Sequence, residues 1–268
     1  MKDNPNKILE TYQTSEGILR LLLNDPKNKN ALSDKMIMHI KEQLLKASTD
    51  KSIKVVIISA VGDVFCSGHN LKELTDARRN EDEGKSYFLE LFNLCSSLMQ
   101  MIISCSKPVI AEIDGIATAA GCQLVASCDL AIASDSSKFA TPGVNIGLFC
   151  STPMVALSRN LSKKDSMRML LTGDMIDATE AKRISLINDH VVANELNESV
   201  MSLAKKIATK PLSTVKIGKD AFYRQSEMSL AEAYEYTSKV MTENSLSDDA
   251  KEGITSFLEK RDPVWKDD

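Results

Sequence analysis

The chain has 268 residues, of which 43% are hydrophobic and 26% are charged, so it can bury the core of one large domain or of a domain with a smaller appendage. The formal net charge of −4 provides no overall positive field, which excludes binding of nucleic acid or of an anionic membrane through global charge. Local lysine or arginine side chains must therefore hold any anionic ligand.

The six cysteines form no Cys-x-x-Cys pair and no cluster with histidine at metal-ligand spacing, so we expect no metal site. Those in apolar runs are expected to be reduced, buried thiols, as in a reducing compartment. Residues 1–7 lack the apolar segment of a secretory signal and the character of a transit peptide. We also find no apolar stretch long enough to span a bilayer. These features predict a soluble, cytoplasmic protein.

The first sixty residues alternate strand and helix patterns. Residues 7–12 and 17–24 predict a β-hairpin, because two short apolar or alternating runs flank a Ser-Glu-Gly turn. A helical spacing of apolar residues follows at 33–45. Residues 53–60 (IKVVIISA) form a continuous, mostly β-branched run, which predicts a strand buried on both faces.

The next segments continue this alternation after a loop and a highly charged stretch. Apolar residues step at helical spacing between positions 88 and 102, which predicts a helix facing the core. Residues 109–113 and 129–134 are predicted strands, and the small residues at 117–128 are predicted to be helical. Strands that alternate with helices indicate an α/β fold with parallel pairing.

Strand patterns fade beyond residue 160, and helical patterns follow one another to the end. The predicted helices are residues 163–171, 179–183, 195–209, 212–224, 230–245 and 249–259. We therefore expect two parts without a long linker: an α/β core over residues 1–200 and a helical region over residues 201–268.

Two loops have the composition that brings backbone close to a ligand. The first is Ser67-Gly68-His69, where glycine permits a sharp turn that points the next N–H into a cleft. The second spans residues 117–122, where small residues precede a helix whose first N–H groups lack partners within the helix. Either loop alone indicates tight packing between a helix and a sheet. Two N–H groups aimed at one oxygen would form an oxyanion hole, which stabilises the enolate of a thioester.

Residues 65–74 (FCSGHNLKEL) resemble the first loop motif of the crotonase (enoyl-CoA hydratase/isomerase) superfamily, and residues 107–128 resemble its second. The match continues through residues 139–148, 171–173 and 257–261. Within the superfamily, residues 121–129 and 141–153 resemble one branch most closely. The resemblance implies a crotonase-like ββα superhelix with a helical C-terminal trimerisation region. It also implies a homotrimer or a dimer of trimers.

Carried over position by position, the resemblance assigns the oxyanion N–H groups to His69 and Ala120. It places the coenzyme A part of an acyl-CoA ligand around the first loop, with Lys72 facing a phosphate and Lys260 or Arg261 reaching it from a neighbouring subunit. The first-loop residues concerned are Ser67, Gly68, His69, Asn70, Leu71 and Lys72. No tightly bound cofactor is expected, because coenzyme A arrives as part of the substrate.

The sequence departs from the family pattern because it lacks the two glutamates that hydratases use to activate water and to protonate the α-carbon. Those positions hold Gln123 and Gly143, and neither residue can accept a proton at useful pH. Residues 145–152, where some isomerases of the family carry one acid, contain no Asp or Glu. Cys150 is the first replacement to consider, as a thiol near a helix start, although a buried, inert thiol is the more common state of such a residue. The His69 imidazole ranks below it, and Gln123 and Asn145 could orient a water without acting as bases.

Three functions remain open. The first is hydration or isomerisation of an enoyl-CoA, and the second is binding of acyl-CoA without catalysis, as a carrier, sensor or modulator. The third is a different thioester reaction, such as decarboxylation or hydrolysis, in which the oxyanion hole supplies most of the rate. Removal of one oxyanion donor typically costs about 10²–10³ in rate, so an intact hole sustains slow chemistry without paired carboxylates.

Overall fold

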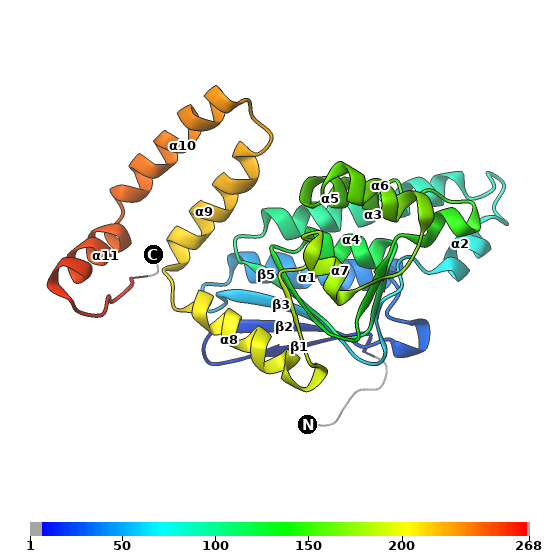
Figure 1. Cartoon of the computed structure of the whole chain (residues 1–268), viewed down its shortest axis with the longest axis horizontal. Coiled ribbons are helices and arrows are strands. Elements are labelled where there is room, and N and C mark those ends of the chain that lie inside the picture. The colour runs from blue at the N-terminus through cyan, green and yellow to red at the C-terminus, as the bar shows by residue number, and fades with distance from the viewer. Residues whose placement is uncertain (1–6, 267–268) are drawn as a thin grey trace.

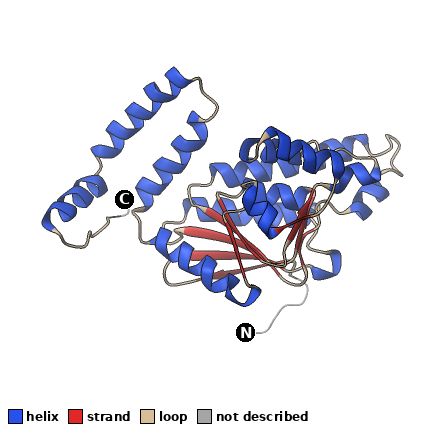
Figure 2. Ribbon diagram, in the orientation of Figure 1, coloured by secondary structure: helices blue, strands red, loops and turns tan. Residues whose placement is uncertain are grey.

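The computed structural model describes residues 7–266 and contains two β-sheets enclosed by helices (Figures 1 and 2). The larger sheet has the strand order β1-β2-β3-β5-β7-β10, in which β1 and β2 are antiparallel and the other pairs are parallel. Its strands are β1 (Leu9–Gln13), β2 (Ile18–Leu23), β3 (Val55–Ala60), β5 (Val109–Ile113), β7 (Leu130–Ser134) and β10 (Asp189–Val191).

The smaller sheet has the order β4-β6-β8-β9 and consists of very short strands. They are β4 (Val64–Cys66), β6 (Ile116–Thr118), β8 (Lys138–Ala140) and β9 (Ile176–Asp177). Strands β4, β6 and β8 are mutually parallel, and β9 is antiparallel to β8. This sheet matters for function because the loops that follow its three parallel strands leave from one edge.

The α-helices of the described residues agree with most of the predicted helical segments. They are α1 (Asp34–Thr49), α2 (Leu71–Ala77), α3 (Lys85–Ser104), α4 (Ala120–Ser127), α5 (Pro153–Asn160), α6 (Lys163–Thr172), α7 (Ala178–Arg183), α8 (Leu196–Ala208), α9 (Leu212–Gln225), α10 (Leu230–Ser245) and α11 (Asp248–Glu259). Within residues 7–266, the connections contain three short 3₁₀ segments, η1 (Pro26–Asn28), η2 (Pro142–Ile146) and η3 (Ala193–Glu195).

Strand β3 is buried on both faces, as its continuous apolar sequence predicts. Val56 and Ile58 face the main core, where α1, α3 and α4 pack. Val55 and Ile57 face the opposite side, which α8 covers. At about 25 cal/mol per Å² of apolar surface, burial on both faces makes this strand a major contributor to stability.

The predicted helix at residues 117–128 is wrong at its start. Ala117 and Thr118 belong to β6, because they pair with Cys66 of β4 and with Phe139 and Ala140 of β8. The chain then turns at Ala119, whose φ of 50° and ψ of −119° lie outside the helical region, and α4 begins at Ala120. Small residues carry little periodicity, so only the pairing across the sheet decides where the strand ends.

The short strands β4, β8 and β9 were also missed, since two or three residues are too few for a visible alternation. A further correction concerns α3, whose 20 residues are long and apolar enough to cross a membrane by length and composition. Five of its residues, from Leu91 to Ile102, are buried against the core, as in a core helix of a globular domain.

Helices α9 to α11 form an arm that extends away from the core (Figure 1). Hydrophobic side chains gather on this arm in the space-filling view, and Phe257 and Leu258 are 82% and 74% exposed. Helix α8 still packs on the sheet. The division of the chain into parts at residues 200 and 201 stays a prediction.

Candidate active site

Three loops meet at one edge of the smaller sheet because the strands that precede them are parallel. Val64 pairs with Ile116, and Thr118 pairs with Ala140, so β4, β6 and β8 end side by side. The carboxyl ends of parallel strands are the usual place for a binding site in α/β folds. The first and second loops of the sequence motif and the segment from Pro142 are thereby brought together.

These loops surround a cavity of about 470 Å³ that is lined mainly by apolar side chains. The lining comes from residues 67–74, 119–120 and 142–153, together with Phe92 of α3. Asp, Glu, Lys and Arg are all absent from the lining within the described part of the chain. The cavity therefore suits an acyl chain, and its walls hold no carboxylate for acid–base chemistry.

The two motif loops are locked against each other. Gly68 has a φ of +93°, and a Cβ at this position would lie 2.9 Å from the Ala119 Cβ and 3.1 Å from the Ala120 nitrogen. The Thr118 hydroxyl donates to the Ser67 carbonyl oxygen at 3.1 Å. Only glycine fits this approach, because a side chain would separate the loops and is disfavoured at such a φ.

The N–H groups of His69 and Ala120 have no hydrogen-bond acceptor within residues 7–266. Ala120 is the first residue of α4, where the helix offers no acceptor, and the positive end of the helix dipole adds to the effect. Both residues line the cavity. Each N–H group is thus free to donate a hydrogen bond to a ligand oxygen in the cavity.

Of the other residues expected to bind coenzyme A, some line the cavity and others lie outside it. Ser67 and Leu71 line the cavity, whereas the Asn70 side chain caps α2 by accepting from the Lys72 N–H at 3.1 Å. Lys72 is exposed on the first turn of α2. Lys260 caps α11 on the arm, and the arm does not bring it to the cavity of its own chain.

Gln123 and Gly143 occupy the positions of the absent carboxylates. Gln123 is 3% exposed, and its Oε1 has no partner in the described part of the protein. Gly143 lines the cavity, but a Cβ there would lie 2.6 Å from the Leu148 carbonyl oxygen and 2.9 Å from the Cys150 Sγ. The folded-back loop therefore fills the space that a side chain at position 143 would need.

Cys150 lines the cavity but is not an activated thiol. It is 8% exposed, and burial raises its pKa above the ordinary value of 9.0, with the Gly143 backbone offsetting only part of this effect. Desolvation outweighs any lowering of the pKa by the nearby helix start, so the structure agrees with a buried thiol rather than with the alternative of an activated one. All six cysteines are free and buried, which includes those in apolar runs for which burial was expected.

The His69 ring is enclosed by the protein, with both ring nitrogens shielded from solvent. Both ring nitrogens are buried without a hydrogen-bond partner among residues 7–266, and the ring meets Phe92 edge to face at 5.4 Å. Burial lowers the pKa of His69 below its ordinary value of 6.5. The ring is therefore a neutral imidazole at neutral pH.

Sequence analysis missed several lining residues, including Phe92, Leu148 and Phe149. Phe92 had no signal of its own, because it lies on the apolar stripe of α3, three residues before Cys95 and seven before Met99, and so reads as a core residue. The loop that follows Gly143 had no signal either, since its conformation depends on tertiary contacts.

A model of the family described as enoyl-CoA hydratase/isomerase matches residues 13–268. The chain belongs to the enoyl-CoA hydratase/isomerase family. It is 49% identical over 257 residues to the mitochondrial enoyl-CoA hydratase domain-containing protein 3 of Xenopus laevis, covering 96% of this chain and 86% of that protein. The human protein of that name is 48% identical over 250 residues, covering 93% of this chain and 81% of that protein.

The crystal structure of human enoyl-CoA hydratase domain-containing protein 3 has a TM-score of 0.92 and 47% identity, and the match covers 97% of this chain and 100% of that one. The predicted crotonase-like fold and the predicted branch of the enoyl-CoA hydratase/isomerase family are thus confirmed. The cytoplasmic prediction is contradicted, because these relatives are named as mitochondrial. Charge and fold do not encode a compartment, since targeting signals are read by separate receptors.

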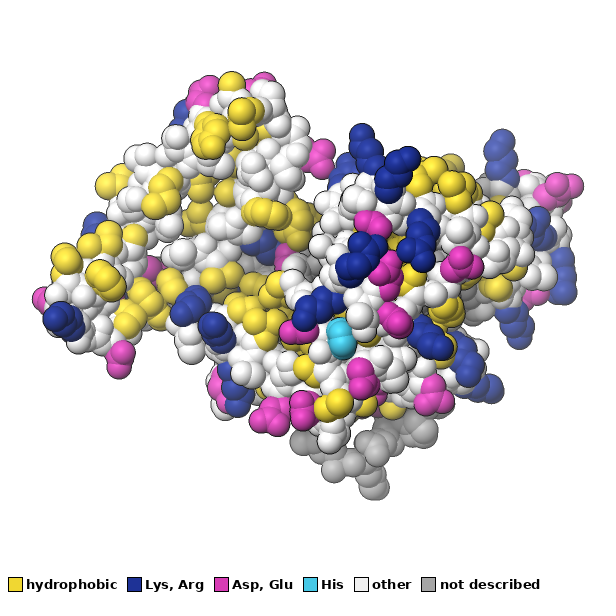
Figure 3. Space-filling view, viewed as in Figure 1, with side chains coloured by type: hydrophobic (Ala, Val, Ile, Leu, Met, Phe, Trp, Pro, Cys, Tyr) yellow, Lys and Arg dark blue, Asp and Glu magenta, His cyan; other side chains and the backbone are white. Residues whose placement is uncertain are grey.

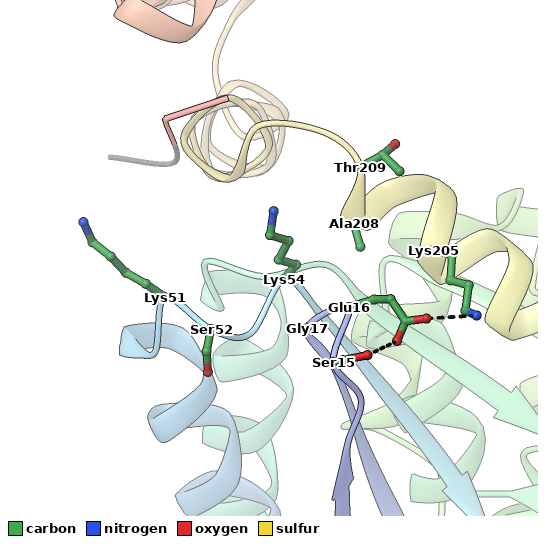
Figure 4. Close-up of a pocket in the computed structure, with 9 residues that line it drawn as sticks. All are labelled: Ser15, Glu16, Gly17, Lys51, Ser52, Lys54, Lys205, Ala208 and Thr209. Atoms are coloured by element: carbon green, nitrogen blue, oxygen red, sulfur yellow. Dashed lines mark hydrogen bonds and ion pairs between the residues drawn. The ribbon is translucent and has the colours of Figure 1, made fainter. Parts of the chain in front are cut away.

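A second hollow of about 380 Å³ lies between the turn at Gly17, the segment before β3 and the end of α8 (Figure 4). Glu16 and Lys205 face each other across it at 3.1 Å, while Lys51 and Lys54 point away from the turn. This hollow lies where β2 and β3 begin, opposite the end at which binding sites of parallel sheets form. Clusters of three or more His, Cys, Asp or Glu that could hold a metal are absent from the described residues.

Proposed function

We propose that this member of the enoyl-CoA hydratase/isomerase family binds an acyl-CoA thioester and polarises its carbonyl group. One observation carries the proposal: two unpartnered backbone N–H groups, of His69 and Ala120, line the same apolar cavity. A thioester oxygen satisfies both donors, and the acyl chain fills the apolar space. The lack of a carboxylate in the lining argues against hydration as the main reaction.

The direct test is isotope-edited infrared spectroscopy of butyryl-CoA labelled with ¹³C at the thioester carbonyl. Two hydrogen bonds from the protein weaken the C=O bond, so the carbonyl band of the bound ligand moves to lower wavenumber than in solution. Calorimetry with the same ligand measures binding separately. Binding with an unshifted carbonyl band contradicts the assignment of the N–H groups, and no binding contradicts the proposal as a whole.

Crotonyl-CoA distinguishes the reactions. A hydratase removes the conjugated double bond and lowers its absorbance, whereas a protein that only binds leaves the absorbance unchanged. We expect binding with little or no hydration, because neither Gln123 nor Gly143 can activate water. Rapid loss of absorbance would overturn this expectation and would require a base that the cavity lining does not offer.

Assembly forms part of the same proposal. A homotrimer or a dimer of trimers would cover the exposed apolar side chains of the arm, among them Phe257 and Leu258. Arg261 is held within its own arm by Glu252 at 2.6 Å and by Glu259 at 2.7 Å. Lys260 is therefore the better candidate to reach a coenzyme A phosphate on a neighbouring subunit. Light scattering measures the assembly directly.

A further inference from the structure

The two backbone donors of the proposed site belong to loops that are anchored to different parts of the fold. In the first loop, the Ser67 N–H donates to the Lys29 carbonyl oxygen at 3.2 Å, which ties this loop to the segment before α1. In the second loop, the Ala119 N–H donates to the Ala140 carbonyl oxygen of β8 at 2.9 Å. Neither anchor joins one loop to the other.

Backbone pairing between β4 and β6 stops just before the two loops begin. The last pair of residues in register is Cys66 with Ala117. One residue further along, the Thr118 hydroxyl donates to the Ser67 carbonyl oxygen at 3.1 Å. A side chain therefore continues the contact at the point where the backbone ladder has ended.

This bridge has the same position relative to each donor. Ser67 lies two residues before His69, and Thr118 lies two residues before Ala120. In the described part of the chain, it is the one hydrogen bond that joins the first loop directly to the second beyond the paired strands. Thr118 itself is not part of the cavity lining, so it acts on a ligand only through the backbone.

The conformation of Ala119 makes the second loop depend on such support. Its φ of 50° and ψ of −119° lie in a region that residues with a side chain rarely adopt. A strained conformation of this kind persists only where the surrounding contacts impose it. Thr118 directly precedes Ala119, so loss of its bridge allows the loop to relax and to carry the Ala120 N–H away from the first loop.

We infer that the Thr118 hydroxyl positions the two carbonyl-polarising N–H groups relative to each other. This inference rests on the proposed function, in which one thioester oxygen lies between the donors of His69 and Ala120. Donors of this type stabilise charge on an oxygen only when both are held at hydrogen-bond distance from it. Thr118 is thus a positioning residue, and its hydroxyl is the group that matters.

The test compares butyryl-CoA with S-butyl-CoA, a thioether that carries the same chain length and nucleotide but no carbonyl oxygen. Calorimetry of both ligands gives the ratio of their affinities, which isolates the contribution of the carbonyl contacts. We expect T118V to lower this preference for the thioester by about 2- to 10-fold, as for loss of one hydrogen bond, and to leave S-butyl-CoA binding unchanged. The infrared carbonyl band of bound butyryl-CoA should move back toward its position in solution.

Three further variants separate the hydroxyl from the packing around it. T118A also removes the hydroxyl but places no methyl group beside the Ser67 oxygen, so it should give the same result as T118V. T118S keeps the hydroxyl and should restore both the preference and the infrared shift. T237V is the matched control, because the Thr237 hydroxyl donates to the Ala233 carbonyl oxygen at 2.7 Å within α10, outside the cavity lining. It should behave as the unchanged protein.

The outcomes distinguish the inference from the proposed function. Wild-type preference and an unchanged carbonyl band in T118V or T118A overturn the inference and leave the proposed function intact. Equal losses for butyryl-CoA and S-butyl-CoA also overturn it, since they show that Thr118 supports the cavity as a whole. If the unchanged protein binds the two ligands equally, or binds neither, the proposed function itself fails.

Discussion

The Lys219 ammonium group on α9 lies 2.6 Å from Oδ2 of Asp129, which directly precedes β7. The same ammonium donates to the backbone oxygens of Ile102 at 2.9 Å and Lys107 at 3.0 Å. The Tyr223 hydroxyl donates to the other oxygen of Asp129 at 2.9 Å. The side chains of Lys219 and Asp129 are only 8% and 15% exposed, so this ion pair joins the arm to the core in a poorly solvated place.

Replacing Lys219 with Met should lower the free energy of unfolding by about 3 kcal/mol, because it leaves the Asp129 carboxylate buried without its cation. Urea unfolding measures the loss, and hydrogen exchange should show faster opening of α9. K239M is the matched control: Lys239 pairs with Glu235 at 2.7 Å, but the two side chains are 69% and 72% exposed. Such an exposed pair contributes only about 0.3–0.5 kcal/mol, so equal losses would contradict the role given to Lys219.

Gly121 lets α4 approach β4 closely. A Cβ at this position would lie 2.1 Å from the Cys66 carbonyl oxygen, so G121A must move the start of α4 away from the first loop. We expect a destabilisation of about 1–3 kcal/mol and a smaller infrared shift of bound butyryl-CoA, because the Ala120 N–H moves with the helix.

G218A provides the control for the glycine substitution. A Cβ at Gly218 on α9 meets nothing within 4 Å, so alanine there should raise stability by about 0.5–1 kcal/mol through better helix propensity. If both variants retain the full infrared shift, the Ala120 N–H is not the donor that polarises the carbonyl.

Alkylation of Cys150 by iodoacetamide tests its protonation state. Because burial raises the thiol pKa above 9.0, labelling near pH 7.5 should be slower than that of glutathione and should still be rising above pH 9. Mass spectrometry after digestion identifies the labelled position, and the same protein in urea serves as the fully reactive reference. Fast labelling of the folded protein at pH 7.5 would show an activated thiol and restore Cys150 as a catalytic candidate.

K72A tests the expected phosphate contact of the first loop. Lys72 is exposed, so its interaction with a coenzyme A phosphate should contribute about 1 kcal/mol, and affinity for butyryl-CoA should fall about five-fold. Butyryl-pantetheine carries the same thioester without the nucleotide phosphates. Its binding, measured by calorimetry, should be unchanged in K72A, and an equal loss for both ligands would show that Lys72 acts through the fold.

Local sequence patterns were sufficient to predict the strands and helices that each bury a large apolar face. The run at residues 53–60 predicted β3, and the helical spacing between positions 88 and 102 predicted α3, because burial of one or both faces imposes a period on the sequence. The Gly68 turn was also visible, since the close approach of two backbones leaves no room for a side chain. The family followed from such short-range motifs, and the comparisons confirm it.

Pairing between β4, β6 and β8 had no such local signal, because each of these strands has three residues and its partners are distant in sequence. Properties that depend on the surroundings of a residue, such as its pKa, likewise have no local signal in the sequence. Burial, rather than proximity to a helix, sets the pKa of Cys150, and the packing of α1 and α3 leaves the His69 ring unpartnered beside the cavity. Sequence alone therefore predicted which backbone segments form the candidate site, whereas tertiary packing decided the burial and the pKa of the side chains beside them, because desolvation and hydrogen bonding arise only between distant segments.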